Sequence, residues 1–205
     1  MTTPAGFTAR ELRSLRALRT PYGVQRALDA MPYHHASTAW SPRRVLAAGT
    51  AHCLEGAIFA AAALRVLGFP PLLLDLEAVQ DTDHVLAVYG RRGGWGAIAK
   101  SNFAGLRYRE PVYRSVRELV MSYFDDYINL RGDRTLRAYS RPVDLARFDG
   151  SHPGWMTSPD DLWWVAEHLV GARHTRLLTP AMVRALRRTD RRSLDAGLVG
   201  YRAHR

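Results

Sequence analysis

Cysteine and lysine are almost missing from this sequence: each occurs once in 205 residues, as Cys53 and Lys100. A single cysteine excludes an internal disulfide and any zinc site built on several cysteines, and it is typical of a reducing cytoplasm. No apolar run is long enough to cross a bilayer, and the polar N-terminal sequence lacks the apolar core of a signal peptide. We therefore expect a soluble, cytoplasmic protein that does not associate with membranes.

Positive charge is the main imbalance of the composition. The formal net charge is +10, and of the 29 basic residues one is lysine, which leaves 28 arginines. Such a preference for arginine is typical of GC-rich bacterial genomes. The arginines are spread over three segments whose spacing predicts helices, at 10–19, 131–147 and 173–192, without an aromatic-interleaved run or a nucleic-acid motif. We interpret them as solvated helix faces and do not expect nucleic-acid binding as the primary role.

The length and the hydrophobic content of 47% predict a single domain over residues 1–205. Its core is expected at about 48–130, between helical flanks at 8–47 and 155–190. Residues 51–67 are apolar on nearly every side, which predicts a central buried helix that ends at Gly68. Five further helix starts are marked by a capping Ser or Thr followed by proline or an acidic residue: Thr8, Thr20, Ser41, Ser158 and Thr179.

Three short apolar runs follow the buried helix, at 70–79, 84–90 and 93–101, and the turn sequences DTD and RRGG separate them. Runs of this length between turn residues predict strands, of which the second and third form a hairpin. Residues 115–129 return to helical spacing. The order of helices, a buried helix, a small and mostly antiparallel sheet, and more helices predicts an α+β fold.

The single cysteine lies at the start of the buried helix, directly after His52. A helix N-terminus offers unpaired backbone N–H groups and a positive partial charge, which favour a thiolate and can hold a developing oxyanion. His84 opens the second predicted strand, where its imidazole could face back across the helix end. These residues predict a nucleophile and its general base. The alternative is that Cys53 packs as a small apolar side chain and His84 bonds to the turn acids Asp81 or Asp83.

A cysteine on the first turn of a buried helix, followed by a strand, a strand led by histidine and a strand containing Gly-Trp, resembles the core of the transglutaminase-like superfamily. That superfamily is itself similar to papain-like cysteine proteases. The resemblance covers about residues 48–102 and depends on Cys53, His84 and the sequence GGW at 93–95. It implies a transglutaminase-like core in which the cysteine attacks an acyl group, the histidine activates the cysteine, and an acidic residue on the third strand orients the histidine.

One position departs from the pattern of that family. Four residues after Trp95, where many members have aspartate, this sequence has Ala99. Ser101 lies on the same strand face by alternation, and Asn102 could turn inward at the strand end, as asparagine does in papain-like enzymes. We therefore expect Ser101 or Asn102 to orient His84. A third position left unfilled would slow catalysis by several orders of magnitude.

Three basic residues beside the third predicted strand are candidates for substrate binding. Lys100 supplies a point charge in a chain that otherwise uses arginine, although its retention by chance is the alternative. Arg107 and Arg109 lie in the connection 101–115, where they could receive a carboxylate or a phosphate; equally, they could pair with nearby acids. The sequence indicates no metal and no cofactor, because three other histidines lack further ligands at metal-site spacing: His34, His35 and His152.

Together these residues predict cysteine-dependent acyl transfer or hydrolysis at an amide or thioester bond, with Cys53 as nucleophile and His84 as base and then acid. The partner would be a peptide, amide or thioester substrate, and the charge of +10 would favour an acidic carrier protein. The alternative is a non-catalytic binding or scaffold module with the same fold, which the alanine at position 99 favours.

Overall fold

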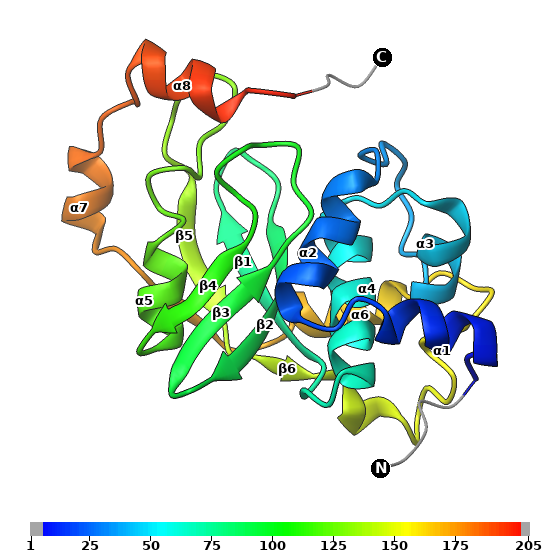
Figure 1. Ribbon diagram of the computed structural model, residues 1–205. Helices are drawn as coiled ribbons and strands as arrows, with labels where there is room; N and C mark the ends of the chain where they lie inside the picture. Colours follow the sequence, from blue (N-terminus) through cyan, green and yellow to red (C-terminus); the bar gives the residue numbers. More distant parts are fainter. Residues whose placement is uncertain (1–5, 202–205) are drawn as a thin grey trace.

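The computed structural model describes residues 6–201 and has an α+β architecture, in which helices lie on both faces of one sheet (Figure 1). Within the described residues there are eight α-helices, a short 3₁₀-helix and a sheet of seven strands. The order along the sheet is β4-β3-β2-β1-β5-β7, with β6 also paired to β1, and every strand pairing in it is antiparallel. The predicted α+β class with a mostly antiparallel sheet is confirmed. No helix in residues 6–201 is long and apolar enough to cross a membrane.

The three N-terminal helices begin where the capping signals place them. A capping box joins Thr8 and Glu11 at the start of α1 (Ala9–Arg16), so both side chains satisfy backbone N–H groups of the first turn. Helices α2 (Pro21–Ala30) and α3 (Pro42–Ala48) each have a capping hydroxyl and a proline in the first turn. All three pack against α4, and α2 also contacts β3 of the sheet (Figure 1).

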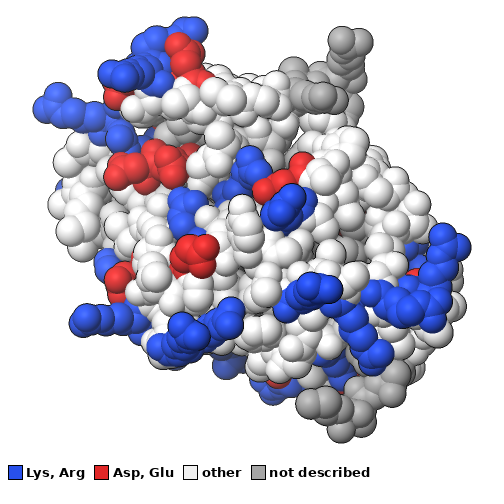
Figure 2. Space-filling model, in the orientation of Figure 1, with Lys and Arg blue, Asp and Glu red and all other residues white. Residues whose placement is uncertain are grey.

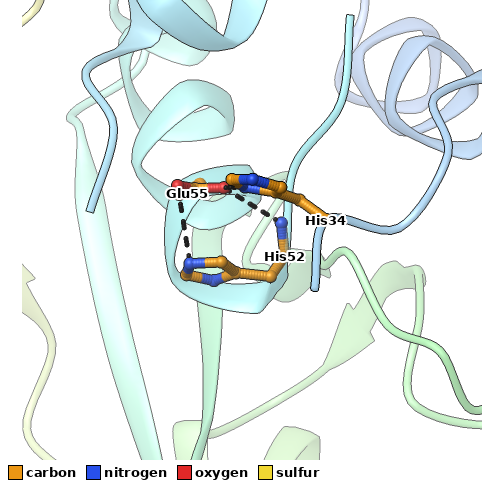
Figure 3. A group of neighbouring side chains, drawn as sticks. All are labelled: His34, His52 and Glu55. Carbon is orange, nitrogen blue, oxygen red and sulfur yellow. Dashed lines mark hydrogen bonds and ion pairs between the residues drawn. The ribbon is translucent and has the colours of Figure 1, made fainter. Parts of the chain in front are cut away.

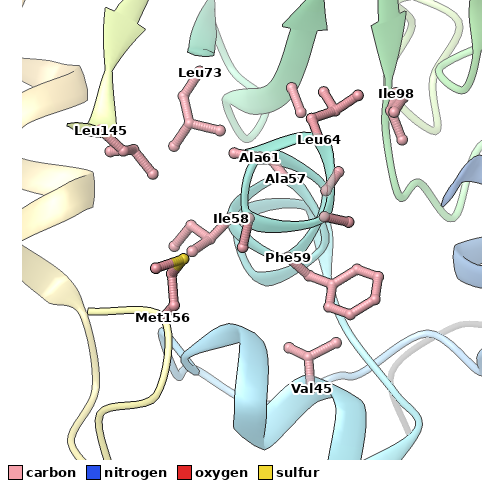
Figure 4. Packing of buried hydrophobic residues seen from close by; sticks show 14 of the residues in the cluster. Val45, Ala57, Ile58, Phe59, Ala61, Leu64, Leu73, Ile98, Leu145 and Met156 are labelled. Carbon is pink, nitrogen blue, oxygen red and sulfur yellow. The ribbon is translucent and has the colours of Figure 1, made fainter. Parts of the chain in front are cut away.

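Helix α4 (Cys53–Val66) is the predicted buried helix, and every residue from Leu54 to Leu64 is buried. In Figure 4 its side chains contact residues of α3, of the sheet and of the segment 145–156. A Cβ atom at Gly56 would lie 2.5 Å from the Cβ of Lys100. Glycine at this position therefore allows the first turn of α4 to approach the end of the third strand closely.

The three predicted strands are β1 (Leu72–Ala78), β2 (His84–Arg91) and β3 (Gly94–Ile98), and β2 and β3 form the predicted hairpin. Alternate residues of β2 enter two different cores, as the pleat of a strand requires. Val85, Ala87 and Tyr89 pack with α4, whereas Leu86 and Val88 pack on the opposite face. That second core is closed by α5 (Val116–Met121).

Several segments differ from the sequence prediction because tertiary pairing overrides local spacing. The predicted helix over 131–147 is wrong: β5 (Leu136–Ser140) and β6 (Val143–Asp144) pair with β1 instead. The connection over 101–115 contains β4 (Arg109–Tyr113), which pairs with β3. Helix α5 is shorter than the predicted 115–129, because the hydroxyl of Tyr127 donates to the Leu76 and Thr82 carbonyls and draws the chain away from the helix axis.

The C-terminal third contains the 3₁₀-helix η1 (Leu145–Phe148), α6 (Trp163–Val170), β7 (His174–Arg176), α7 (Pro180–Ala185) and α8 (Arg191–Gly197). Helix α6 begins five residues after Ser158, the predicted start. The reason is contact with α3: Ser41 donates to the Ser158 carbonyl, and Arg44 pairs with Asp161 at 2.5 Å. Asp161, which follows the predicted helix start, thus pairs with an arginine of another helix.

Charged side chains are scattered over the molecule. On the face shown in Figure 2, basic side chains alternate with acidic and uncharged ones and do not form one continuous band. Many arginines are paired with acids, for example Arg65 with Asp149 at 2.5 Å and Arg134 with Asp125 at 3.0 Å. This distribution agrees with the interpretation of the arginines as solvated side chains on the surface.

Candidate functional site

The first residue of α4 is Cys53, and its sulfur lies against the first residues of β2. The backbone of Val85 and Leu54 and the hydroxyl of Tyr33 lie close enough to this sulfur to affect its charge. Val85 directly follows His84, so the candidate nucleophile touches the backbone next to the candidate base. This contact follows from the packing of α4 on β2.

The environment of the Cys53 sulfur has two opposing effects on its charge. Burial raises the pKa of the thiol, while the hydrogen bonds from Val85, Leu54 and Tyr33 lower it; burial is the larger effect, and the pKa lies above its usual value. At neutral pH the group is therefore a thiol in the free protein. The same donors would stabilise negative charge that appears on the sulfur once its proton is removed.

The ring of His84 is held by the chain around it. Its Nε2 atom donates to the carbonyl of Leu106 at 3.0 Å, and the ring of Tyr127 packs against it edge to face with a centroid distance of 6.4 Å. Burial lowers the pKa of His84 from 6.5 to about 4, so the ring is neutral at pH 7. Among the described residues no hydrogen-bond partner reaches Nδ1, which in this tautomer carries the free lone pair.

The orienting group differs from the one that the sequence predicts. Nε2 of His84 donates to the backbone carbonyl of Leu106 and not to the side chain of Ser101 or Asn102. The Ser101 hydroxyl instead accepts the backbone N–H of Phe103 at 3.0 Å. Sequence reasoning missed Leu106 because a carbonyl is present in every residue and leaves no mark in the side-chain pattern.

The segment that carries Leu106 is fixed from both sides. Arg109 donates to the Gly105 carbonyl at 2.9 Å and to the Ser122 carbonyl at 3.0 Å. The hydroxyl of Tyr123, in the turn after α5, donates to the Arg107 carbonyl at 2.8 Å. These contacts set the position of the Leu106 carbonyl and thereby the orientation of His84.

Cys53 and His84 line one pocket of about 190 Å³. It opens between the start of α4, the turn before β2 and the segment after β3, and Ser101 and Asn102 lie on its wall. A second pocket of about 330 Å³ adjoins it and shares four residues with it. The shared residues are Tyr33, Ser101, Asn102 and Phe103.

Glu55, two residues after Cys53, is fully buried at the centre of a hydrogen-bond network (Figure 3). His34 Nδ1 lies 2.9 Å from Oε2, which also accepts the backbone N–H of His52 at 3.2 Å. The hydroxyl of Thr38 donates to Oε1 at 2.5 Å and the backbone N–H of Trp40 at 3.2 Å. Burial alone would raise the pKa of Glu55, but the hydrogen bonds from Thr38 and His34 and the nearby His52 lower it below its usual value.

This network is also the group of described residues whose types suit a metal ion: the nearest ligand atoms of His34, His52 and Glu55 lie within 4.8 Å of one another. Sequence spacing did not reveal it, because His34 is far from the other two along the chain. Both carboxylate oxygens already accept hydrogen bonds, and Nε2 of His52 lies 2.7 Å from the Thr38 carbonyl. The hydrogen bonds account for every polar atom of the carboxylate without an ion.

The three basic candidates for substrate binding are engaged within the protein. Lys100 is buried, and its ammonium group donates to the carbonyls of Leu28, at 2.8 Å, and Met31 at the end of α2. Arg107 lines the larger pocket and pairs with Asp29 at 2.6 Å. Arg109 stacks over a tyrosine ring beside α5 and lines neither of the two pockets.

Comparison with known proteins gives no family for this chain. Its sequence matches no model of a known protein family, and no curated protein matches it. The function therefore has to be argued from the geometry of the pocket.

Proposed function

We propose that this protein is a cysteine-dependent acyltransferase or hydrolase that acts on an amide or thioester bond, with a core of the transglutaminase-like type. The observation that carries the proposal is the position of the Cys53 sulfur. It lies at the N-terminus of a buried helix, next to backbone N–H groups that favour negative charge on it, and shares a pocket with a neutral histidine whose Nε2 is fixed. These are the parts that nucleophilic catalysis by a thiol needs.

The chemistry divides between the two residues as follows. Nδ1 of His84 takes the thiol proton as the sulfur attacks the acyl carbon, and the electron pair of the C=O bond moves to the oxygen. When the C=O bond re-forms, the bond to the leaving group breaks and His84 returns the proton to that group. A thioester on Cys53 remains, and water or an amine, deprotonated by His84, attacks its carbonyl carbon. The C–S bond then breaks, the acyl product leaves, and the Cys53 sulfur takes the proton back from His84.

In the free protein the thiol and the imidazole are both neutral, because burial raises the pKa of Cys53 and lowers that of His84. His84 is not among the groups that hydrogen-bond to the sulfur. The proton transfer thus belongs to the step in which substrate fills the pocket, and no thiolate–imidazolium pair is needed beforehand.

The second candidate is a non-catalytic binding or scaffold module. Two observations favour it: no hydrogen bond joins Cys53 to His84 among the described residues, and the position expected to carry an acid holds Ala99, which is buried. In that case Cys53 would pack as a small side chain and would be inert.

Acylation by p-nitrophenyl acetate separates the two candidates. The enzyme predicts a burst of p-nitrophenol together with the mass of one acetyl group on Cys53, which is identified by peptide mapping. Cys53→Ala abolishes the adduct, and His84→Gln, which retains a donor toward the Leu106 carbonyl, slows acylation by at least about 100-fold. His168→Gln, at an exposed histidine outside the pocket, serves as the control. A folded wild-type protein that acquires no acetyl group on Cys53 would establish the binding module.

A further inference from the structure

The nucleophile has a neighbour that the sequence did not indicate. Tyr33 lies in the segment between α2 and α3 and lines the same pocket as Cys53, where its hydroxyl lies next to the sulfur and the backbone N–H of Cys53. The phenol is thus a polar neighbour of both the sulfur and the first N–H group of α4. Burial and the neighbouring sulfur raise the pKa of Tyr33 above its usual range, so the hydroxyl keeps its proton at neutral pH.

The backbone N–H of a nucleophilic residue at a helix start points to the place where the oxygen of a bound acyl group becomes negative. In this structure the Tyr33 hydroxyl lies beside that place, in the pocket that Cys53 lines. From there the hydroxyl can turn its proton from the sulfur to an acyl oxygen that moves in beside it. One proton donor thus serves the sulfur first and the oxyanion afterwards.

Tyr33 is held in place by both neighbouring layers of the fold. Its backbone forms a bridge with Ala51, and the next residue, His34, donates its backbone N–H to the Ala51 carbonyl at 3.1 Å. The ring of His34 is bound to the buried carboxylate of Glu55. On the other side, Lys100 binds the carbonyl of Met31, two residues before Tyr33.

We propose that Tyr33 is a catalytic residue of the proposed acyl transfer: its hydroxyl and the backbone N–H of Cys53 together form the oxyanion hole. This inference depends on the proposed function and adds to it the group that stabilises the tetrahedral intermediate. It also gives the Glu55 network and Lys100 a role, because both position the segment that carries Tyr33.

Two reactions of the same sulfur test this role. Acetylation by p-nitrophenyl acetate passes through an oxyanion, whereas alkylation by iodoacetamide displaces iodide at a saturated carbon and forms none. Tyr33→Phe keeps the ring and removes the hydroxyl. We expect it to slow acetylation of Cys53 by about 100-fold, the loss typical of one oxyanion-hole donor. Alkylation is expected to slow by less than about tenfold, through loss of the hydrogen bond to the sulfur.

Tyr89→Phe is the matched control, because Tyr89 is a buried tyrosine whose hydroxyl pairs with that of Tyr108 and which lines neither pocket. It should leave both rates unchanged, and thermal unfolding verifies that both variants are folded. Equal loss of both rates in Tyr33→Phe, or an increase in both, would overturn the oxyanion role while leaving the acyl transfer intact. A wild-type protein that is alkylated but never acetylated at Cys53 would refute the proposed function, and the inference with it.

Discussion

Two groups of polar side chains meet at the first turn of α4, and they differ in how completely their hydrogen bonds are satisfied. On one side Glu55 is fully buried, and both of its oxygens accept hydrogen bonds from His34, Thr38 and the backbone. On the other side His84, which lines a pocket, has a ring nitrogen for which the described residues supply no hydrogen-bond partner.

Within the first three residues of α4, Glu55 thus belongs to a structural network, whereas Cys53 belongs to the pocket. A saturated buried network makes the fold rigid and specific, and it has no capacity left for a ligand. A fixed ring with a free lone pair beside a desolvated thiol has that capacity. We infer that Glu55 builds the site and that Cys53 and His84 act in it. The predictions below test this division.

The largest effect is expected at Glu55. Glu55→Gln removes the charge that His34 and Thr38 face in a buried network, and we expect the free energy of unfolding to fall by about 3 kcal/mol at pH 7. Urea denaturation followed by circular dichroism measures the change. Glu167→Gln, at an exposed glutamate of α6, is the control and should change it by less than about 0.5 kcal/mol. A loss as small as that of the control would show that the network does not hold the helix start.

Because His84 is buried as a neutral ring, we expect the free energy of unfolding to fall at acidic pH. Its pKa in the folded state is about 4, below the usual value of 6.5, so unfolding takes up a proton between these two pH values and the folded state loses stability as the pH falls through this range. Above pH 6.5 the effect is absent. This pKa difference corresponds to a fall of at most about 3 kcal/mol in the free energy of unfolding. About 2 kcal/mol of that fall should have appeared by pH 4.5.

The comparison of His84→Gln with the wild type isolates the contribution of His84 protonation to stability. The variant should lose about 2 kcal/mol less than the wild type between pH 7 and pH 4.5, measured by urea denaturation. His168→Gln, at an exposed histidine, should follow the wild type. Parallel curves for the wild type and His84→Gln would mean that the ring is not buried as a neutral group.

The smallest effect is expected at the mouth of the pocket. Tyr201 lines the pocket of Cys53 and packs on Phe103 with a centroid distance of 5.3 Å. Tyr201→Ala should expose the sulfur and raise the rate of iodoacetamide labelling at pH 8 severalfold, with little change in stability. Tyr22→Ala, at an exposed tyrosine far from this pocket, is the control. An unchanged rate would show that this ring does not restrict access.

Local signals predicted the start of the fold well. The capping box at Thr8, the prolines after Thr20 and Ser41, and the apolar run of α4 each act within a few residues, so the sequence contains the whole physical cause. Segments whose form depends on distant partners were missed. In β5 the alternating burial of Leu136, Ala138 and Ser140 exists only because the strand lies beside β1.

In the site, too, the contributions that depend on residues distant in the sequence could not be predicted. Cys53 and His84 were predicted because a thiol and an imidazole carry chemistry by themselves, and the structure places both on one pocket. Leu106 could not be found, since its contribution is a carbonyl, and Tyr33 lies 20 positions before the cysteine with no spacing that links them. Lys100 was noticed for its rarity, but its ammonium group closes the end of α2.

The reaction of the single cysteine with iodoacetamide in native protein, followed from pH 5 to pH 9, tests the pairing of Cys53 with His84 most directly. We expect slow labelling at pH 6, where both groups are neutral, and a rate that rises with pH and stays at least about tenfold higher in the wild type than in His84→Gln. Equal rates in the two proteins, or labelling that begins only when the protein is unfolded in urea, would contradict the account.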